Sequence, residues 1–282
     1  MDKHLQKLRR SRERMPNYRE VLELAERLLI EKQQMKDRGC GSSFKPDPVK
    51  AKIQVQEGFP YLRPAEALLN SSQVGEYFCR LLKGFGEINH ARYESLENSM
   101  KAKGFVLERF LERLLQNQLS EQNLEEELGP EGSLLFFFLI QTLKPTFEIQ
   151  AEQWRTSMKE LSWTQGYCPF CGGFPSMGEI RKEGKRMLHC PLCATEWEYP
   201  RVKCPYCQNE DQEQLTYFQV EGEIGNRVDI CLACRHYLKT IDSRDMGGFL
   251  DFEVEDYLTL HLDHLAQEEG FFRPSRLFVE VR

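Results

Sequence analysis

The sequence predicts an α+β multidomain fold: an all-α N-terminal domain, then two small β modules with four cysteines each, and a C-terminal helix. Three observations predict it. Apolar residues recur at helical spacing through the first 165 residues, and short strand-like stretches separated by turns follow from Gly166. Eight of the ten cysteines stand in four Cys-x-x-Cys pairs within 67 residues. We therefore expect domains at residues 1–165, 166–203 and 204–282.

The bulk composition is that of an ordinary soluble globular protein. The chain has 282 residues, of which 40% are hydrophobic and 29% charged, and its formal net charge is −6. Residues 166–282 contain 13 basic and 20 acidic side chains and so carry −7, while the preceding residues are about neutral. Because contacts of Lys and Arg with phosphate dominate nucleic-acid binding, we expect no nucleic-acid partner.

No segment of the sequence predicts export or membrane insertion. Arg9 and Arg10 stand side by side, but charged residues follow them instead of the apolar region of a signal peptide. The longest apolar run, residues 134–140, has seven residues, against the roughly 20 needed to span a bilayer. The sequence therefore predicts a cytoplasmic protein, and in that reducing compartment paired cysteines are more often metal ligands than disulfides.

Four amphipathic segments predict the helical domain. The first runs from Asn17 to about Lys36, after a proline at a position where helices start. Ser72 is the expected N-cap of the second. The third is Phe105–Leu119. The fourth, Ser133–Met158, begins almost wholly apolar, which predicts a buried central helix that contains Pro145.

Short strands between cysteine turns predict the β modules. Two hairpins are expected, around residues 183–184 and 222–226, and a further strand follows each. The order of cysteine turn, hairpin, cysteine turn and strand thus occurs twice, which indicates a duplicated module. A helix is expected at about Glu255–Gln267. The strands are predicted at Phe174–Arg181, Lys185–His189, Thr195–Lys203, Leu215–Val220, Arg227–Ile230 and His236–Ile241.

The four cysteine pairs predict two metal sites. Two residues between cysteines let one tight turn direct both sulfurs at one point, and two such turns complete a tetrahedron of thiolates. Sequential pairing is the simplest arrangement, and an interleaved one, first pair with third and second with fourth, stays open. The candidate ligands are Cys168, Cys171, Cys190 and Cys193 for the first site and Cys204, Cys207, Cys231 and Cys234 for the second.

Four sulfurs suit zinc or iron, and the residues alone leave the choice open. Cys168-Pro-Phe-Cys171 is followed by glycine, a rubredoxin-like feature, since a small residue there lets backbone N–H groups approach the sulfur. The modules are therefore expected to be rubredoxin-like or zinc-ribbon folds. Their metals would be structural, each holding together a module too small to bury a core, or would include iron with a redox role.

The remaining chemistry-bearing residues receive structural interpretations. His189 and His236 stand near ligand cysteines, but four cysteines already complete each site. Cys40 is expected to be a thiol in a loop and Cys79 a buried small residue. No glycine-rich phosphate loop, nucleophile elbow or recognisable carboxylate pair is present in the sequence, so no catalytic residue is assigned.

One long stretch and three shorter ones carry a family resemblance. The long stretch is Arg186-Met-Leu-His-Cys190-Pro-Leu-Cys193-Ala-Thr-Glu-Trp197-Glu-Tyr-Pro-Arg201-Val-Lys-Cys204-Pro-Tyr-Cys207. The shorter ones are Cys168-Pro-Phe-Cys171-Gly, Cys231-Leu-Ala-Cys234-Arg-His-Tyr-Leu-Lys and Glu268-Glu-Gly-Phe271-Phe-Arg273. Over roughly residues 166–275 the chain resembles the formate dehydrogenase accessory proteins, the FdhE family.

The resemblance implies a cytoplasmic, chaperone-like accessory factor that is not an enzyme. Such a factor binds the catalytic subunit of respiratory formate dehydrogenase and is needed for its maturation to the active form. The resemblance also implies rubredoxin-like modules that hold iron, so iron is the first choice at both sites and zinc the second. All eight cysteines carry over individually. The family's motif is also matched, without an assigned chemical role, by His189, Glu196, Trp197, Arg201 and Lys203.

Two other classes of function stay open. A rubredoxin-like electron carrier would bind iron and be reversibly reduced. A zinc-ribbon nucleic-acid-binding protein would need a basic stripe with exposed aromatic side chains. The charge of −7 from residue 166 onward argues against such a stripe.

Overall fold

The computed structural model describes residues 2–40, 44–158, 162–244 and 250–279, and it divides into two compact units. A helical unit contains Met1–Lys45, Arg63–Trp154 and Ser275–Leu277. A sheet unit contains Pro46–Leu62, Arg155–Pro274 and Phe278–Arg282. The predicted fold class is confirmed, since helices come first, a sheet with two four-cysteine groups follows, and helices come after the sheet. The three domain ranges given above stay a prediction.

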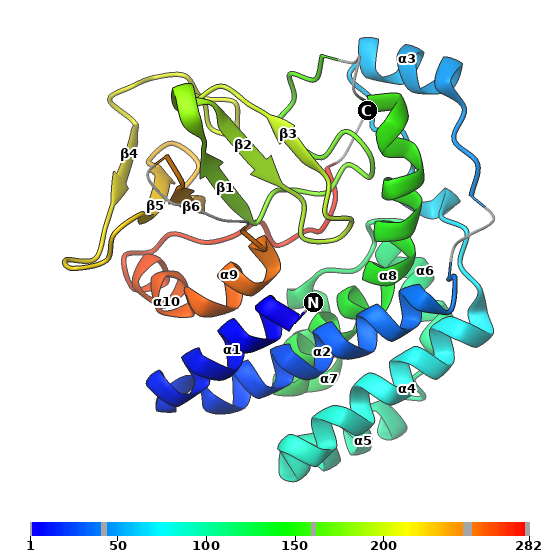
Figure 1. Cartoon of the computed structure of the whole chain (residues 1–282). Coiled ribbons are helices and arrows are strands. Elements are labelled where there is room, and N and C mark those ends of the chain that lie inside the picture. Colours follow the sequence, from blue (N-terminus) through cyan, green and yellow to red (C-terminus); the bar gives the residue numbers. More distant parts are fainter. Residues whose placement is uncertain (1, 41–43, 159–161, 245–249, 280–282) are drawn as a thin grey trace. The chain divides into compact units, whose positions relative to one another are not determined.

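The helical unit is built around one long buried helix, α8 (Figure 1). The side chains of Phe138, Leu143, Phe147 and Trp154 on α8 are 0% exposed, and Pro145 lies within it as predicted. The apolar faces of α2 and α4 are buried as well, which follows from their helical spacing. The bounds are α1 (Asp2–Arg14), α2 (Arg19–Asp37), α4 (Ser71–Ile88), α5 (His90–Ala102), α6 (Leu107–Leu115), α7 (Glu121–Leu128) and α8 (Gly132–Met158).

Two predicted helix boundaries need correction. A short 3₁₀ turn at Pro16–Tyr18 precedes α2, so the α-helix begins at Arg19 and not at Asn17. The N-cap of α4 is Asn70 instead of Ser72, because its side-chain oxygen accepts a hydrogen bond of 3.1 Å from the backbone N–H of Gln73. Asparagine and serine are about equally good caps, so the sequence alone does not separate neighbouring candidates.

One of the two interpretations of the unpaired cysteines was wrong. Cys40 lies in a turn after α2, as expected for a loop thiol, and its side chain is 1% exposed. Cys79, expected to be buried, lies on an exposed face of α4. Burial raises the pKa of the Cys40 thiol above its usual value.

Alkylation is therefore expected to distinguish these two thiols. In the metal-loaded protein, iodoacetamide should modify Cys79 at least about tenfold faster than Cys40, because only Cys79 is accessible and thiolate forms least readily where it is buried. Peptide mapping by mass spectrometry would measure both rates, with Cys79→Ser as the control. Equal rates at the two positions would contradict the burial of Cys40.

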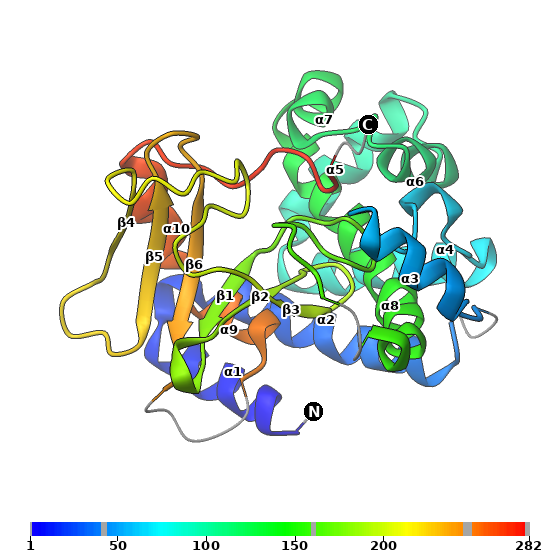
Figure 2. The same cartoon turned by 90° about the horizontal axis from the view of Figure 1, so that it is seen from above.

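The sheet unit contains one mixed sheet of six strands, in the order β3-β2-β1-β6-β5-β4 (Figures 1 and 2). Both predicted hairpins are present, and Glu183 and Gly184 have positive φ at the first turn. The strands are β1 (Met177–Ile180), β2 (Arg186–His189), β3 (Glu196–Glu198), β4 (Leu215–Phe218), β5 (Asn226–Cys231) and β6 (Tyr237–Asp242).

The two duplicated modules share this single sheet. Each is an antiparallel three-stranded meander, β1-β2-β3 and β4-β5-β6. They join through β1 and β6, which pair in parallel with Met177 opposite Lys239 and Ile180 opposite Asp242. The modules therefore lie side by side in the same orientation, and the pairing covers one edge of each.

A segment from the first half of the sequence belongs to the sheet unit. It spans Pro46–Leu62 and contains α3 (Pro48–Gln56). Its last residues contact the first cysteine turn, Cys168 to Cys171. There the backbone N–H groups of Tyr61 and Leu62 donate to the carbonyls of Pro169 and Phe170, at 2.9 and 2.7 Å. Both donors have buried side chains, so this segment shields the first cysteine turn from solvent.

Two short helices follow the sheet in place of the single helix predicted at Glu255–Gln267. They are α9 (Phe252–Leu258) and α10 (Leu260–Glu268), and Thr259 between them leaves the helical conformation at φ −113° and ψ 27°. Val228 and Tyr237 of the sheet pack against Leu262 and Ala266 of α10, so α10 covers one face of β5 and β6. Among the described residues, no helix combines the length and apolar character needed to cross a membrane.

Candidate metal centres

The first two cysteine pairs lie together as one group. Cys168 and Cys171 precede β1 and Cys190 and Cys193 follow β2, so the antiparallel hairpin brings both turns to one end. The Sγ atoms of Cys168 and Cys193 are 3.5 Å apart, and Cys171 Sγ lies 3.6 Å from those of Cys190 and Cys193. All four side chains are 0% exposed. This group is therefore closed to solvent.

The last two pairs form a second group at the β4–β5 hairpin, which is more open. The Sγ atoms of Cys204 and Cys234 are 3.7 Å apart, as are those of Cys207 and Cys231. Cys204 and Cys231 are buried, whereas Cys234 is half-buried and Cys207 is exposed. The two groups thus share their ligand type and differ in solvent access.

Both groups fit one tetrahedral ion each. With metal–sulfur bonds of about 2.3 Å, the sulfurs of a tetrahedron lie about 3.8 Å apart, close to the distances seen here. Within each group the four sulfurs lie within 4.8 Å of one another, so each group could hold a metal ion. The pairs are grouped sequentially, and the interleaved arrangement is not the one adopted. The donor set suits zinc or iron.

One turn geometry is repeated four times around these cysteines. In the first turn the N–H of Cys168 donates to the carbonyl of Gly173, and that of Gly172 donates back to Cys168, at 2.8 and 2.9 Å. The turns that begin at Cys190, Cys204 and Cys231 have the same two bonds. The residue after each second cysteine has positive φ, and only in the first turn is it glycine. These residues are Gly172, Ala194, Gln208 and Arg235.

Substitution at this turn position should have opposite consequences in the first and second turns. Gly172→Ala is expected to lower the free energy of unfolding by about 1–2 kcal/mol, because alanine is strained at φ +73°. Its Cβ would also lie 3.0 Å from Pro60 Cγ. The matched variant Ala194→Gly relieves the same strain at φ +54° and should not destabilise. Denaturant unfolding of the metal-loaded proteins measures both, and equal destabilisation would contradict the strain argument.

Comparison with known proteins shows a similarity that covers part of the chain. Residues 167–201 match the model of the FdhE central domain, and residues 202–278 match the model of the FdhE C-terminal domain. An FdhE homolog from Aquifex aeolicus is 35% identical over 158 residues, which are 54% of each chain. Over residues 167–278 the chain matches the FdhE family. An FdhE homolog from Pseudomonas aeruginosa is 31% identical over 162 residues.

The similarity of sequence to these FdhE homologs is partial, whereas the fold is shared throughout. The match spans about half the length of the curated relatives, 54% and 52%. The crystal structure of the FdhE protein from Pseudomonas aeruginosa superimposes with a TM-score of 0.64 and covers 98% of this chain and 93% of that one. At 24% identity this likeness shows the fold. Both four-cysteine groups lie inside the two matched FdhE domains.

The histidines of the FdhE motif are not part of the cysteine groups. His189 packs its ring against Phe252, with centroids 4.9 Å apart, and burial lowers its pKa. His236 lies near the second group, but its Nδ1 is 2.9 Å from the carbonyl oxygen of Cys234 and its ring faces Tyr206. Their placement agrees with the structural interpretation, in which four sulfurs complete each group.

The other motif residues contact neighbours within the sheet unit. Trp197 is buried, and its indole N–H donates to the carbonyl of Gln165 at 3.2 Å. Glu196 pairs with Arg181, and Lys203 pairs with Glu210. The Thr195 hydroxyl lies 3.2 Å from Cys193 Sγ, where it could donate to a thiolate. Thr195 was not singled out from the sequence, and its place directly after a Cys-x-x-Cys-x turn was the available signal.

Proposed function

We propose that this chain is an accessory factor for a formate dehydrogenase, which binds the catalytic subunit and is needed for its maturation to the active form. The observation that carries the proposal is the match of residues 167–278 to both FdhE domains, with all eight paired cysteines inside it. The proposed factor acts in the cytoplasm, is not an enzyme, inserts into no membrane and binds no nucleic acid.

The proposed cofactors are two metal ions, one in each four-cysteine group, with iron as first choice and zinc as second. Cys168, Cys171, Cys190 and Cys193 would hold the first ion, and Cys204, Cys207, Cys231 and Cys234 the second. Each bound ion would cross-link a hairpin to the turns at its end. Because β1 and β6 join the modules in one sheet, the two ions would stabilise a single rigid surface.

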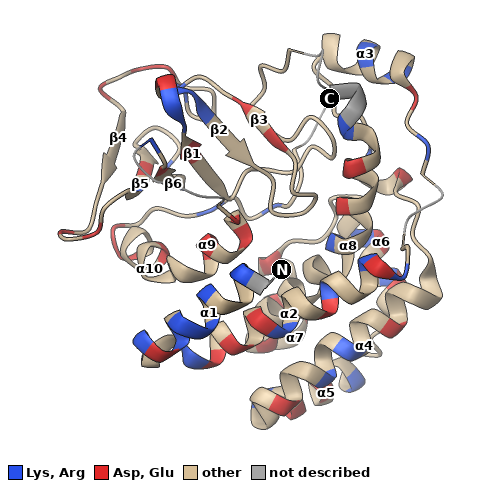
Figure 3. Ribbon diagram, viewed as in Figure 1, with Lys and Arg blue, Asp and Glu red and all other residues tan. Residues whose placement is uncertain are grey.

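Charge on the sheet unit suggests which side of a client it would meet. Acidic side chains lie on α9 and in the β4–β5 turn, where the residues include Glu221 and Glu223 (Figure 3). Residues 166–282 carry −7 in total. Charge complementarity raises association rates and selects partners, so a basic client surface is the expected counterpart.

Co-purification tests the proposal. The tagged full-length chain, produced with its metals, should retain the formate dehydrogenase catalytic subunit on an affinity column. Deleting its gene should abolish formate-dependent respiration, and the wild-type gene should restore it. Cys79→Ser should restore it equally, because Cys79 lies outside both groups. Intact formate respiration in the deletion strain would refute the proposal.

A rubredoxin-like electron carrier is the second candidate, and one observation favours it. The second group reaches the surface through Cys207, as an electron-transfer site requires. This function predicts iron after anaerobic purification, with reversible reduction centred on the second group. Zinc-only protein that fully complements the deletion would exclude it, and the accessory function would stand.

A further inference from the structure

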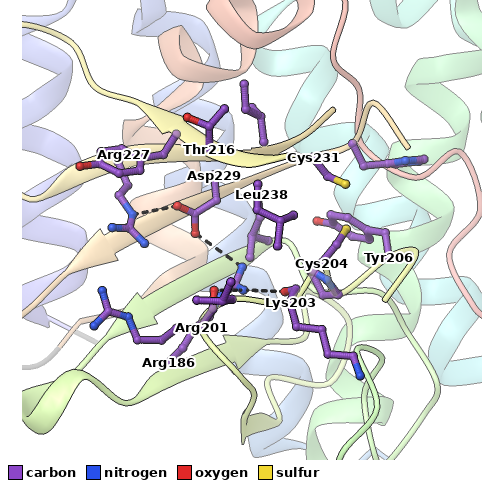
Figure 4. A pocket seen from close by; sticks show the side chains of 16 residues that line it. Arg186, Arg201, Lys203, Cys204, Tyr206, Thr216, Arg227, Asp229, Cys231 and Leu238 are labelled. Atoms are coloured by element: carbon purple, nitrogen blue, oxygen red, sulfur yellow. Dashed lines mark hydrogen bonds and ion pairs between the residues drawn. The ribbon is translucent and has the colours of Figure 1, made fainter. Parts of the chain in front are cut away.

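A pocket of about 320 Å³ opens beside the second cysteine group, within the sheet unit (Figure 4). Side chains alternate between the two faces of a strand, so the residues that line the pocket show on which face of the sheet it lies. Val228 and Tyr237 face α10, so their neighbours Asp229 and Leu238, which line the pocket, face the other way. The pocket therefore lies on the sheet face that α10 leaves uncovered.

The lining is strongly basic, although this half of the chain is acidic overall. Arg186, Arg201, Lys203 and Arg227 line the pocket, and Asp229 is the single carboxylate among its lining residues. Figure 4 shows the arginines toward one end and the sulfurs of Cys204 and Cys231 toward the other. Lys203 is paired with Glu210, but three arginines around one carboxylate still leave a surplus of positive charge inside a concave site, which focuses the field on an anion.

The single carboxylate of Asp229 is shared between two arginines and a hydroxyl group, so it cannot neutralise this surplus of positive charge. Its Oδ2 lies 3.5 Å from Arg186 Nη2 and accepts a hydrogen bond of 2.8 Å from the Thr240 hydroxyl. Its Oδ1 lies 2.8 Å from Arg227 Nε. The two form an ion pair, but their geometry is not that of a hydrogen bond. The carboxylate orients the two guanidinium groups and leaves their other N–H donors to a ligand.

One nitrogen of Arg186 has no hydrogen-bond partner among the described residues. The residue is 4% exposed, and its Nη1 donates to the carbonyl of Lys203 at 3.0 Å. The nitrogen without a partner in the described part of the chain is Nε, which is buried. A buried unpaired N–H is costly, so the fold keeps the Arg186 guanidinium in this place at the expense of one unmade hydrogen bond.

The rest of the lining fits a ligand with an apolar or planar part. Leu215 and Leu238 supply apolar walls, and the ring centroid of Tyr217 lies 4.8 Å from the guanidinium carbon of Arg227. A concave site of this size, with apolar walls and convergent polar groups, is typical of small-molecule sites and too small for a folded partner.

We propose that this pocket binds a small anionic molecule, whose phosphate or carboxylate group lies among Arg186, Arg201 and Arg227. Guanidinium groups bind both oxyanions through paired N–H donors. The less polar part of the ligand would lie against Leu238 and Tyr217. The inference is independent of the proposed accessory function, because binding alone decides it.

Calorimetric titration of the metal-loaded full-length protein tests the proposal. The probes are inorganic phosphate, pyrophosphate, adenosine monophosphate and succinate, each at millimolar concentrations and at constant ionic strength. Saturable binding of at least one probe is expected. Preference for the phosphate compounds or for succinate would identify which oxyanion the site takes.

Two substitutions should weaken that binding, and a matched one should not. Arg201→Gln and Arg227→Gln are each expected to raise the Kd at least about tenfold, because each removes a charge-assisted contact. Arg181→Gln removes the same charge from the sheet unit outside the pocket, where Arg181 pairs with Glu179 and Glu196, and should leave the Kd unchanged. Absence of binding by every probe, or equal weakening by Arg181→Gln, would overturn the proposal.

Discussion

Replacing Cys190 with serine is expected to remove the metal of the first group and to unfold the first module. Cys190 and its three partner cysteines are 0% exposed. Without the ion, three thiols and a hydroxyl would remain packed in an interior that offers them few partners. A structural four-cysteine zinc site contributes roughly 10–16 kcal/mol of folding free energy, more than the total stability of many domains. Loss of the ion therefore outweighs what the short strands β1, β2 and β3 can contribute.

Elemental analysis measures the metal content, and circular dichroism measures the loss of β structure. The metal content should fall from two ions per chain to one, with loss of the β signal and faster proteolysis between residues 166 and 203. Cys79→Ser, a change of the same kind at an exposed position outside both groups, should keep two ions. Two ions retained in Cys190→Ser, or one lost in Cys79→Ser, would refute the ligand assignment.

The second group should lose its ion more easily than the first. Cys207 is exposed and Cys234 half-buried, so a chelator can approach this ion directly, whereas the first group must open before a chelator reaches it. Stopped-flow mixing with a chromogenic chelator should give a fast phase of one ion and a slow phase of one ion. Cys207→Ser should remove the fast phase alone, and loss of the slow phase instead would reverse the assignment.

The cysteine turns could be predicted because their determinants are local. A Cys-x-x-Cys pair fixes two sulfurs within one turn, and the hairpin between consecutive pairs fixes which turns meet. The same holds for α8, whose apolar run signals burial within the helix itself. In all four turns the hydrogen bonds lie within six residues of sequence, for example from Cys204 to Asn209.

Features that depend on contacts between distant residues could not be predicted. β1 pairs with β6 across about 60 residues, and neither strand carries a signal for a parallel partner. The exposure of Cys40 and Cys79 depends on which surfaces their neighbours cover, and composition does not show that. The pocket escaped notice because Arg186 is buried by other parts of the chain, among them the backbone of Lys203 and the carboxylate of Asp229.

Replacing Asp256 with asparagine is expected to lower the free energy of unfolding at neutral pH by about 3 kcal/mol, as when one partner of a buried ion pair is lost. Asp256 Oδ1 lies 2.7 Å from the Nζ of Lys239, whose side chain is 1% exposed. Lys239 also pairs with Asp263 at 2.6 Å, and Arg273 contacts both carboxylates. These four residues join α9, α10 and the segment that follows α10 to β6.

Asp242 supplies a matched control for this change. The side chains of Asp256 and Asp242 are about equally exposed, 25% and 23%. Their partners differ, because Lys239 is buried whereas Arg244 is 49% exposed. Asp242→Asn should therefore cost less than about 1 kcal/mol, as is usual for a surface pair. Equal costs for the two variants would show that burial of the partner lysine does not matter.

The carboxylate of Asp256 also sets an acid limit on the stability of the sheet unit. Burial alone would raise the pKa of Asp256, but Arg273 and Lys239 outweigh it and hold that pKa well below its usual range. A carboxyl whose folded pKa is depressed adds stability above its unfolded pKa of about 4, and this contribution is lost as the pH falls further. Wild type should therefore lose its advantage over Asp256→Asn below about pH 4. Acid also protonates thiolates and releases metal, but both proteins share that loss, so the difference between their unfolding free energies isolates Asp256. A difference that stays constant from pH 7 down to about pH 2 would show that the carboxylate does not stabilise this network.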